Sequence, residues 1–160
     1  MGTGKSCVGR IVAEQLGYEL VDMDAVIEER AGKIISRIFE EDGEPAFRKM
    51  ETEVALELSG RTGLVIAAGG GVVLDPRNME AFSGGGVTVC LKAQPDTILK
   101  RVETDQHRPL LEDGEKAARV RDLLEKRRPL YEAVPLGVDT DDLGPEAVAE
   151  RVLELYRAAE

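Results

Sequence analysis

Apolar residues recur along the chain in two patterns, one typical of helices and one typical of strands. Residues 8–16 place apolar side chains every three or four positions, whereas residues 64–68 are a continuous apolar run and residues 86–91 repeat this pattern with one threonine. Such runs are typical of strands buried on both faces of a parallel sheet. The pattern predicts helices over residues 8–16, 24–31, 44–58, 95–102, 117–128 and 145–159, a short periodic piece at 34–39, and strands over 18–22, 64–68, 86–91 and 137–140.

The alternation of strands and helices predicts an α/β layered fold with a parallel sheet. With 160 residues, the chain is expected to form a single domain covering residues 1–160. We expect Pro129 to end the helix that begins near residue 117, because the residue before a proline is biased away from helical backbone. No repeat or low-complexity tract interrupts this organisation.

Charge and composition narrow the class of partner. The formal net charge is −10, which argues against nucleic acid or an anionic membrane as a partner, since both require a basic surface. No run is long enough to cross a membrane and no secretory signal is evident, so a cytoplasmic protein is expected. Cys7 and Cys90 lack metal or redox spacing, and we expect both to be small buried residues.

The first six residues contain the back half of a phosphate-binding P-loop. Gly4-Lys5-Ser6 matches the end of the pattern G-x-x-x-x-G-K-[ST], and a helical pattern follows directly. In such a loop, backbone N–H groups and the helix N-terminus surround phosphates, the lysine reaches the β- and γ-phosphates, and the serine hydroxyl binds Mg²⁺. The alternative is a glycine-rich turn with an exposed lysine.

Two aspartates lie at the end of the first predicted strand. Asp22 and Asp24 lie at the end of the strand over residues 18–22, and ligands of open α/β sheets bind beyond the carboxyl ends of strands. One carboxylate could hold Mg²⁺ while the other accepts a hydrogen bond from a substrate hydroxyl. The simpler alternative is that Asp24 caps the helix that follows.

Glycines and arginines supply the other candidate groups. Gly69-Gly70-Gly71 would let a ligand approach the backbone closely, although a tight turn alone also explains the triplet. Arginine recognises carboxylates and phosphates with two parallel hydrogen bonds. The three arginines that stand out are Arg48, Arg108 and Arg127. Arg108 lies in a polar, proline-containing segment at residues 104–116 that we expect to be a mobile lid, and His107 is interpreted as a loop residue of that lid.

Together these residues resemble one family, the shikimate kinases. The resemblance runs the length of the chain and rests on the order and spacing of several short motifs, none of which is specific alone. They are Gly2-Thr3-Gly4-Lys5-Ser6, Asp22-x-Asp24 with Ile27-Glu28, Gly43-Glu44 with Phe47-Arg48 and Glu51, Gly69-Gly70-Gly71, Arg108-Pro109-Leu110-Leu111, and Arg127-x-Pro129-Leu130-Tyr131.

The resemblance implies transfer of the ATP γ-phosphate to the 3-hydroxyl of shikimate, in aromatic amino-acid biosynthesis, by a monomer. Lys5, Asp24 and Arg108 are the implied catalytic residues, and Ser6 and Asp22 the implied Mg²⁺ ligands. The implied ATP contacts are Gly2, Thr3, Gly4, Lys5, Ser6, Cys7, Arg101, Arg108 and Pro145. The implied shikimate contacts are Asp24, Arg48, Gly69, Gly70, Gly71 and Arg127. Family members commonly carry threonine at the position of Cys7.

The implied fold is a three-layer P-loop fold of the nucleoside-monophosphate-kinase type, whose parallel sheet has the P-loop strand in its middle. The chain departs from that pattern, because the central first strand and the first P-loop glycine would precede Met1. A mis-assigned start, an engineered truncation and a genuinely shortened protein would all explain the departure. Two other functions stay open: an inactive or partner-dependent remnant, and a related small-molecule kinase such as a gluconate kinase.

Overall fold

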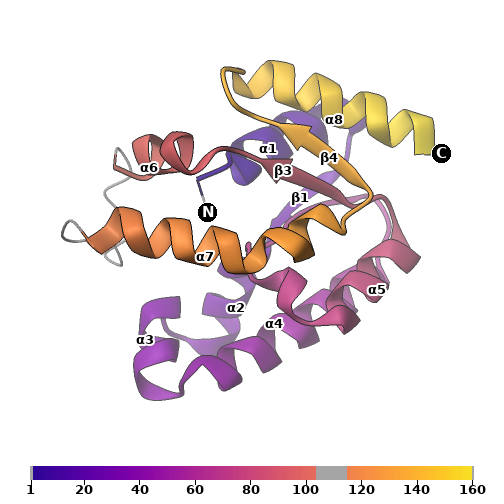
Figure 1. The fold of residues 1–160 in the computed structure, drawn as a ribbon. Helices are drawn as coiled ribbons and strands as arrows, with labels where there is room; N and C mark the ends of the chain where they lie inside the picture. The colour runs from indigo at the N-terminus through magenta and orange to yellow at the C-terminus, as the bar shows by residue number, and fades with distance from the viewer. Residues whose placement is uncertain (1, 104–114, 160) are drawn as a thin grey trace.

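The structure is a computed structural model that describes residues 2–103 and 115–159. In chain order its elements are α1 (Lys5–Leu16), β1 (Glu19–Asp22), α2 (Met23–Ala31), α3 (Ile35–Glu41), α4 (Glu44–Ser59), β2 (Leu64–Ala67), the 3₁₀ helix η1 (Val72–Leu74), α5 (Pro76–Gly85), β3 (Val89–Lys92), α6 (Pro95–Glu103), α7 (Glu115–Glu132), β4 (Leu136–Asp139) and α8 (Pro145–Ala159). The predicted α/β class is confirmed (Figure 1).

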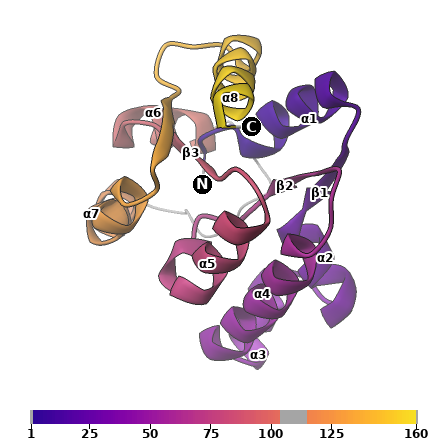
Figure 2. The ribbon, with the colours of Figure 1, turned by 90° about the vertical axis from the view of Figure 1, so that its right-hand side faces the viewer.

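The described strands form two parallel pairs. β1 pairs with β2, with Glu19 opposite Leu64, and β3 pairs with β4, with Val89 opposite Leu136. Among the described residues no ladder joins one pair to the other. Figure 2 shows β1 and β2 on one side of the molecule and β3 beside α6 and α8.

Helices cover both faces of the strands. Val8 and Val12 of α1 share a cluster with residues of α8, and both strand pairs contribute to it through Val65 and Val89. The first helix therefore packs across both pairs. Its Gly9 is buried, and a β-carbon there would lie 3.1 Å from Cδ1 of Leu20, so a larger residue would require the Leu20 side chain to shift.

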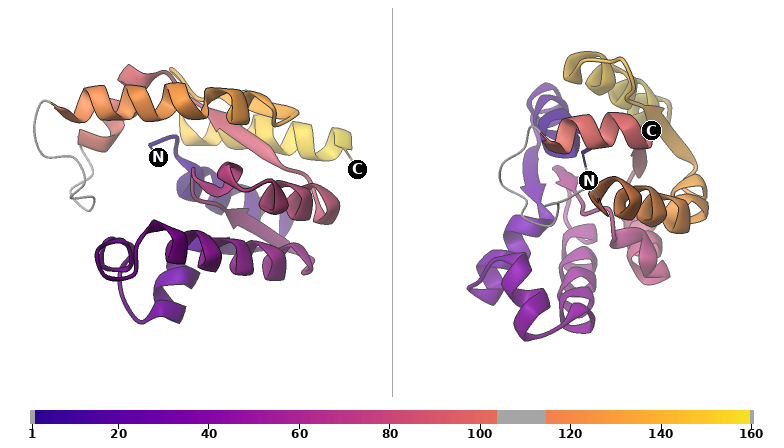
Figure 3. Two further views of the ribbon diagram at one scale, coloured as in Figure 1. Left: turned by 60° about the horizontal axis from the view of Figure 1, so that its bottom comes forward. Right: turned by 60° about the vertical axis from the view of Figure 1, so that its left-hand side comes forward.

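A second cluster lies on the opposite face. It is built from residues of β1, α2, α3, α4 and η1: Val21, Met23, Ile27, Ile38, Phe47, Val54, Ala55, Leu58, Val72 and Val73. The predicted apolar face of the helix over residues 44–58 is part of it. Figure 3 shows the purple α3 and α4 at one end of the molecule and the orange α7 and yellow α8 at the other.

Several boundaries differ from the predictions. The helix expected to end before Pro129 continues to Glu132 with the proline inside it, and it begins at Glu115, within the range predicted for the lid. The N-terminal cap of α2 is Asp22 rather than Asp24. The prediction missed η1 and α5, although Asp75-Pro76 is a typical helix start, with the aspartate accepting a hydrogen bond from the backbone N–H of Arg77 at 3.0 Å.

Burial of the strands is also lower than predicted. Leu64, Val65 and Ile66 are only half-buried, and so are Val89 and Cys90. Helices cover both faces of β2, but the described residues give it a strand neighbour on one edge only, which leaves the other edge accessible. In the part of the chain that the structure describes, none of the helices has the length and apolar character needed to span a membrane.

Candidate active site

The P-loop residues form the entrance to α1. Gly2 and Gly4 adopt left-handed backbone angles, with φ of 66° and 84°, which residues with a β-carbon rarely adopt. Gly4 is the N-cap of α1, and among the described residues no side chain caps this end and no acidic residue occupies its first turn. The positive end of the helix dipole is therefore directed at a position suited to an anion. Nζ of Lys5 lies 3.5 Å from Oγ1 of Thr3, across the same loop.

The two predicted metal ligands face each other. Oγ of Ser6 donates to Oδ2 of Asp22 at 3.0 Å, which joins the start of α1 to the end of β1. The other oxygen of Asp22 accepts from the backbone N–H groups of Asp24, at 3.0 Å, and Ala25, at 3.4 Å. Asp22 is thus held rigidly by its capping role while one carboxylate oxygen points to the P-loop. A hydroxyl and a carboxylate are the hard oxygen donors that Mg²⁺ prefers.

The Asp24 carboxylate lies beside the glycine triplet. A β-carbon added at Gly69 would lie 3.0 Å from Oδ1 of Asp24 and 3.4 Å from Oε1 of Glu51. At Gly71 an added β-carbon would collide with the guanidinium of Arg48. Glycines at positions 69 and 71 therefore let charged side chains from α2 and α4 approach the backbone closely, and the structure brings these predicted residues together.

Arg48 is fixed by two carboxylates of its own helix. Its Nη1 donates to Oε2 of Glu51 at 2.7 Å, and its Nε and Nη2 both donate to Oε1 of Glu44 at 3.1 Å. Its guanidinium carbon also lies 5.1 Å from the centre of the Phe47 ring. These contacts hold the guanidinium against Gly71 with little freedom to move.

Glu51 is a site residue to which the sequence reasoning gave no role. It is 2% exposed, a rare state for a carboxylate without a partner. Burial raises the pKa of the Glu51 carboxyl, and the nearby Asp24 charge acts in the same direction, while Arg48 and Arg127 act against them. The charges of Asp24, Arg48 and Arg127 therefore all reach this one carboxyl. The available signal was an acidic residue three positions after Arg48, on the apolar face of the same helix.

A pocket of about 230 Å³ lies on the other side of the P-loop. It is lined by Thr3, Gly4, Val8, Arg101, Thr140, Leu143, Pro145 and Val148, which include the predicted nucleotide residues Arg101 and Pro145. Nη1 of Arg101 donates to Oγ1 of Thr140 at 2.9 Å, and its Nη2 donates to the Thr140 carbonyl at 2.7 Å. The guanidinium is therefore tied by both terminal nitrogens to the residue that follows β4, and Thr140 and Leu143 are lining residues that the sequence reasoning missed.

The remaining predicted residues divide into three groups. Arg127 is half-buried on α7, and its charge acts to lower the pKa of the Glu51 carboxyl. The Gly70 carbonyl accepts a hydrogen bond from Oη of Tyr131 at 2.8 Å. Cys7 was expected to be buried but is exposed, because Val8 and Val12 form the inward face of α1. Arg108, His107 and residues 104–114 of the predicted lid lie outside the described residues.

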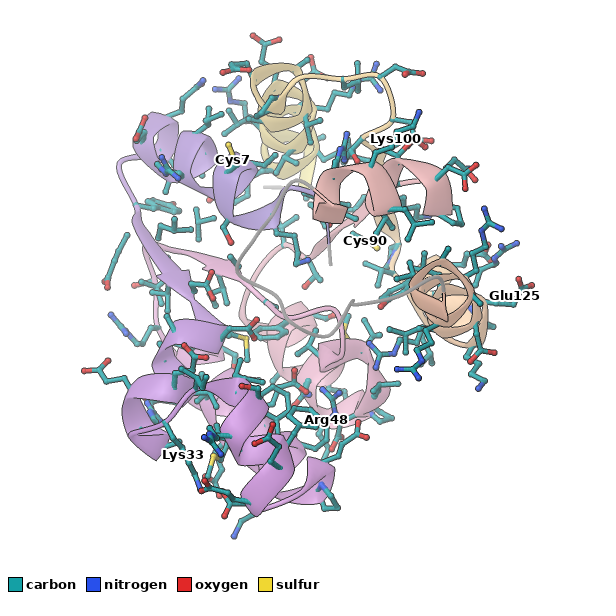
Figure 4. All side chains as sticks on the ribbon, turned by 90° about the vertical axis from the view of Figure 1, so that its left-hand side faces the viewer. Cys7, Lys33, Arg48, Cys90, Lys100 and Glu125 are labelled. Atoms are coloured by element: carbon teal, nitrogen blue, oxygen red, sulfur yellow. The ribbon has the colours of Figure 1, made fainter. Side chains whose placement is uncertain are left out.

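The site therefore has two parts joined by the Ser6–Asp22 contact. In Figure 4, Cys7 lies with α1 in the upper half of the molecule and Arg48 lies beside α4 in the lower half. Among the described residues no group of three or more His, Cys, Asp or Glu side chains could enclose a metal ion.

A family model described as shikimate kinase matches residues 1–157. This chain belongs to the shikimate kinase family. The shikimate kinase of Thermodesulfovibrio yellowstonii is 44% identical over 156 residues, covering 98% of this chain and 90% of the relative. That of Gloeobacter violaceus is 46% identical over 159 residues, covering 99% of this chain and 89% of the relative.

Solved structures agree with the family. The shikimate kinase from Acinetobacter baumannii in complex with shikimate has a TM-score of 0.92 at 38% identity, covering all of this chain and 90% of that one. A gluconokinase from Sinorhizobium meliloti has a TM-score of 0.58 at 18% identity, over 99% of this chain and 90% of that one, which indicates a shared fold alone. The predicted P-loop kinase fold is confirmed by the likeness to the shikimate kinase structure.

Proposed function

We propose that this protein transfers the γ-phosphoryl group of ATP to the 3-hydroxyl of shikimate, giving shikimate 3-phosphate and ADP. The proposal is based on two neighbouring features. One is the N-terminus of α1, which among the described residues no side chain caps, and the other is a second site in which acidic and basic side chains lie close together. The first suits a polyphosphate, and the second contains two arginines and two carboxylates around a glycine turn. Family membership supports the same reaction.

The nucleotide would lie across the P-loop. The backbone of residues 2–6 and Lys5 would surround the phosphates, and the pocket beside Arg101 and Pro145 would take the base. Cys7 lies in the first turn of α1, where its backbone N–H would also face the phosphates. Ser6 and Asp22 would hold Mg²⁺, whose charge offsets the negative charge of the β- and γ-phosphates.

Shikimate would lie between α2, α4, α7 and the glycine turn. Its carboxylate would be bound by the guanidinium groups of Arg48 and Arg127, and backbone N–H groups of the turn at Gly69–Gly71 would complete the contact. Asp24 would accept hydrogen bonds from the ring hydroxyls. Because Asp22 caps α2, the Asp24 carboxylate is not needed for capping and is directed toward Gly69.

Phosphoryl transfer depends mainly on positioning and on neutralising charge. In this proposal Asp24 accepts the proton of the attacking hydroxyl. The ammonium group of Lys5 neutralises negative charge on the phosphoryl group during its transfer. Arg108, which lies outside the described residues, is proposed to neutralise negative charge on the phosphates. A cytoplasmic monomer is proposed as the working form.

The test is a coupled assay for ADP release with ATP, Mg²⁺ and one acceptor at a time: shikimate, gluconate or AMP. Shikimate-dependent turnover that is lost in Lys5→Met is the expected result. Turnover with gluconate or AMP and none with shikimate would contradict the acceptor. A folded protein with no turnover on any acceptor would instead favour the inactive, partner-dependent alternative.

A further inference from the structure

The turn that follows β2 is held from outside by two side chains. Within the turn, the N–H of Val72 donates to the Gly69 carbonyl at 3.1 Å and the N–H of Leu74 donates to the Gly71 carbonyl at 2.9 Å. The carbonyl between them, that of Gly70, accepts from Oη of Tyr131 at 2.8 Å. The Val72 carbonyl accepts from Nδ2 of the fully buried Asn78 at 3.0 Å.

Tyr131 makes its contact from a distant part of the chain. It lies on α7, sixty-one residues after Gly70, and its ring packs against the cluster that contains Val72 and Val73. Residues four positions apart share a face of a helix, so Tyr131 lies one turn after Arg127 on the same side of α7. The Tyr131 hydroxyl therefore connects the helix that carries Arg127 to the turn that contacts Arg48 and Asp24.

Peptide geometry gives this hydrogen bond a directional consequence. The Gly70 carbonyl and the Gly71 N–H belong to one planar trans peptide, so they point in opposite directions. Fixing the carbonyl toward the Tyr131 hydroxyl fixes the Gly71 N–H in the direction away from that hydroxyl. Accepting a hydrogen bond at the carbonyl also polarises the peptide, which makes its N–H a stronger donor.

We propose that Tyr131 is a positioning residue of the acceptor site. Its hydroxyl orients the Gly70–Gly71 peptide and sets the distance from α7 to the glycine turn, so that Arg127, Arg48 and the Gly71 N–H converge on one substrate carboxylate. Tyr131 itself does not touch the substrate in this arrangement. The inference rests on the proposed function, because the ligand it positions is shikimate.

Tyr131→Phe removes the hydroxyl and keeps the ring in the core cluster. The matched control is Tyr18→Phe, which removes a hydroxyl that lies 3.1 Å from Oη of Tyr156 at a solvent-exposed contact between the residue before β1 and α8. For Tyr131→Phe we expect the KM for shikimate to rise by about 3- to 10-fold, the scale of one neutral hydrogen bond. The kcat and the KM for ATP should stay within about twofold, as for a loss of ground-state binding.

The possible outcomes distinguish a failure of the proposed function from a failure of the positioning role of Tyr131. A wild-type protein that does not phosphorylate shikimate overturns both the function and the role of Tyr131. Wild-type turnover with a Tyr131→Phe variant that behaves like Tyr18→Phe overturns the positioning role alone. An equal rise in both KM values, together with a lowered melting temperature, would show that the hydroxyl only stabilises the fold and would also overturn it.

Discussion

At the scale of single residues, the acceptor site depends on a buried charge. Glu51 is 2% exposed and its side chain is joined to Arg48 at 2.7 Å. Removing one partner of a buried pair leaves the other charge uncompensated, which costs more than the pair itself contributes. A simple Arg48→Ala substitution would therefore report on stability as well as on substrate binding, and the two effects have to be separated.

Arg48→Ala should lower the melting temperature and weaken shikimate binding by about 1.5–3 kcal/mol, the scale of a hydrogen bond to a charged group. The double variant Arg48→Ala/Glu51→Gln removes the unpaired charge and should recover most of the melting temperature without recovering shikimate affinity. Calorimetric titration and thermal melting of both variants would measure this. Recovery of affinity in the double variant would contradict direct binding by Arg48.

Asp24 offers a cleaner test, because the cap of α2 is supplied by Asp22. Asp24→Asn keeps the shape of the side chain and removes its charge and its basicity. Turnover should fall by orders of magnitude, roughly the 10²–10⁴-fold assigned to general acid–base catalysis, while the helix content stays unchanged. Steady-state kinetics with a circular dichroism control would measure both, and near-normal kcat would show that Asp24 does not accept the proton.

At the scale of elements, the sequence predicted most helices and strands, and the exceptions have physical reasons. Pro129 cannot donate a backbone hydrogen bond, yet α7 continues through it to Glu132, and this last turn carries Tyr131, whose hydroxyl binds the Gly70 carbonyl. The half-burial of β2 depends on which strands lie beside it, and the spacing of apolar residues along the sequence does not contain that information. Glu51 was not assigned a role, because only the fold places its carboxyl between α2, α4 and α7.

The start of α5 gives a prediction about acid stability. Hydrogen bonds from the side chain and backbone of Arg77 lower the pKa of the Asp75 carboxyl from 3.8 to about 2, and Thr52 of α4 donates to the same carboxyl at 3.5 Å. A carboxyl whose pKa is lower in the folded state contributes stability above its unfolded pKa and loses it as the pH falls. Asp75 should therefore stabilise the fold fully above about pH 4, and this contribution should fade between about pH 4 and pH 2.

Asp75→Asn is the matched variant, because asparagine also serves well as a helix N-cap. Urea unfolding at pH 5, 4 and 3 should show wild type more stable than Asp75→Asn at pH 5, with the difference shrinking as the pH falls. A difference that is constant over this range would mean that the Asp75 charge makes no contribution through Arg77.

At the scale of the whole molecule, α1 joins parts that the strands do not join. Its apolar face packs with β2, β3, β4 and α8, and its N-terminus forms one wall of the pocket beside Arg101. In the described residues the two strand pairs share no ladder, and apolar residues of both pairs meet in the cluster that contains α1, so we expect this packing to couple the pairs during folding. A ligand that bridges the P-loop and the end of β4 would add a further connection between the pairs.

We therefore expect a single cooperative thermal transition that shifts upward with ATP and Mg²⁺. Ligand at a hundred times its Kd stabilises the folded state by about 2.7 kcal/mol, which for a chain of this size raises the melting temperature by roughly 5–10 °C. Arg101→Ala should lose most of the shift caused by ATP and keep the shift caused by shikimate, because the pocket and the acceptor site use different residues. Scanning calorimetry would measure these shifts. Two separate transitions would mean that α1 does not couple the strand pairs, and the absence of any cooperative transition would favour a chain that folds only with a partner.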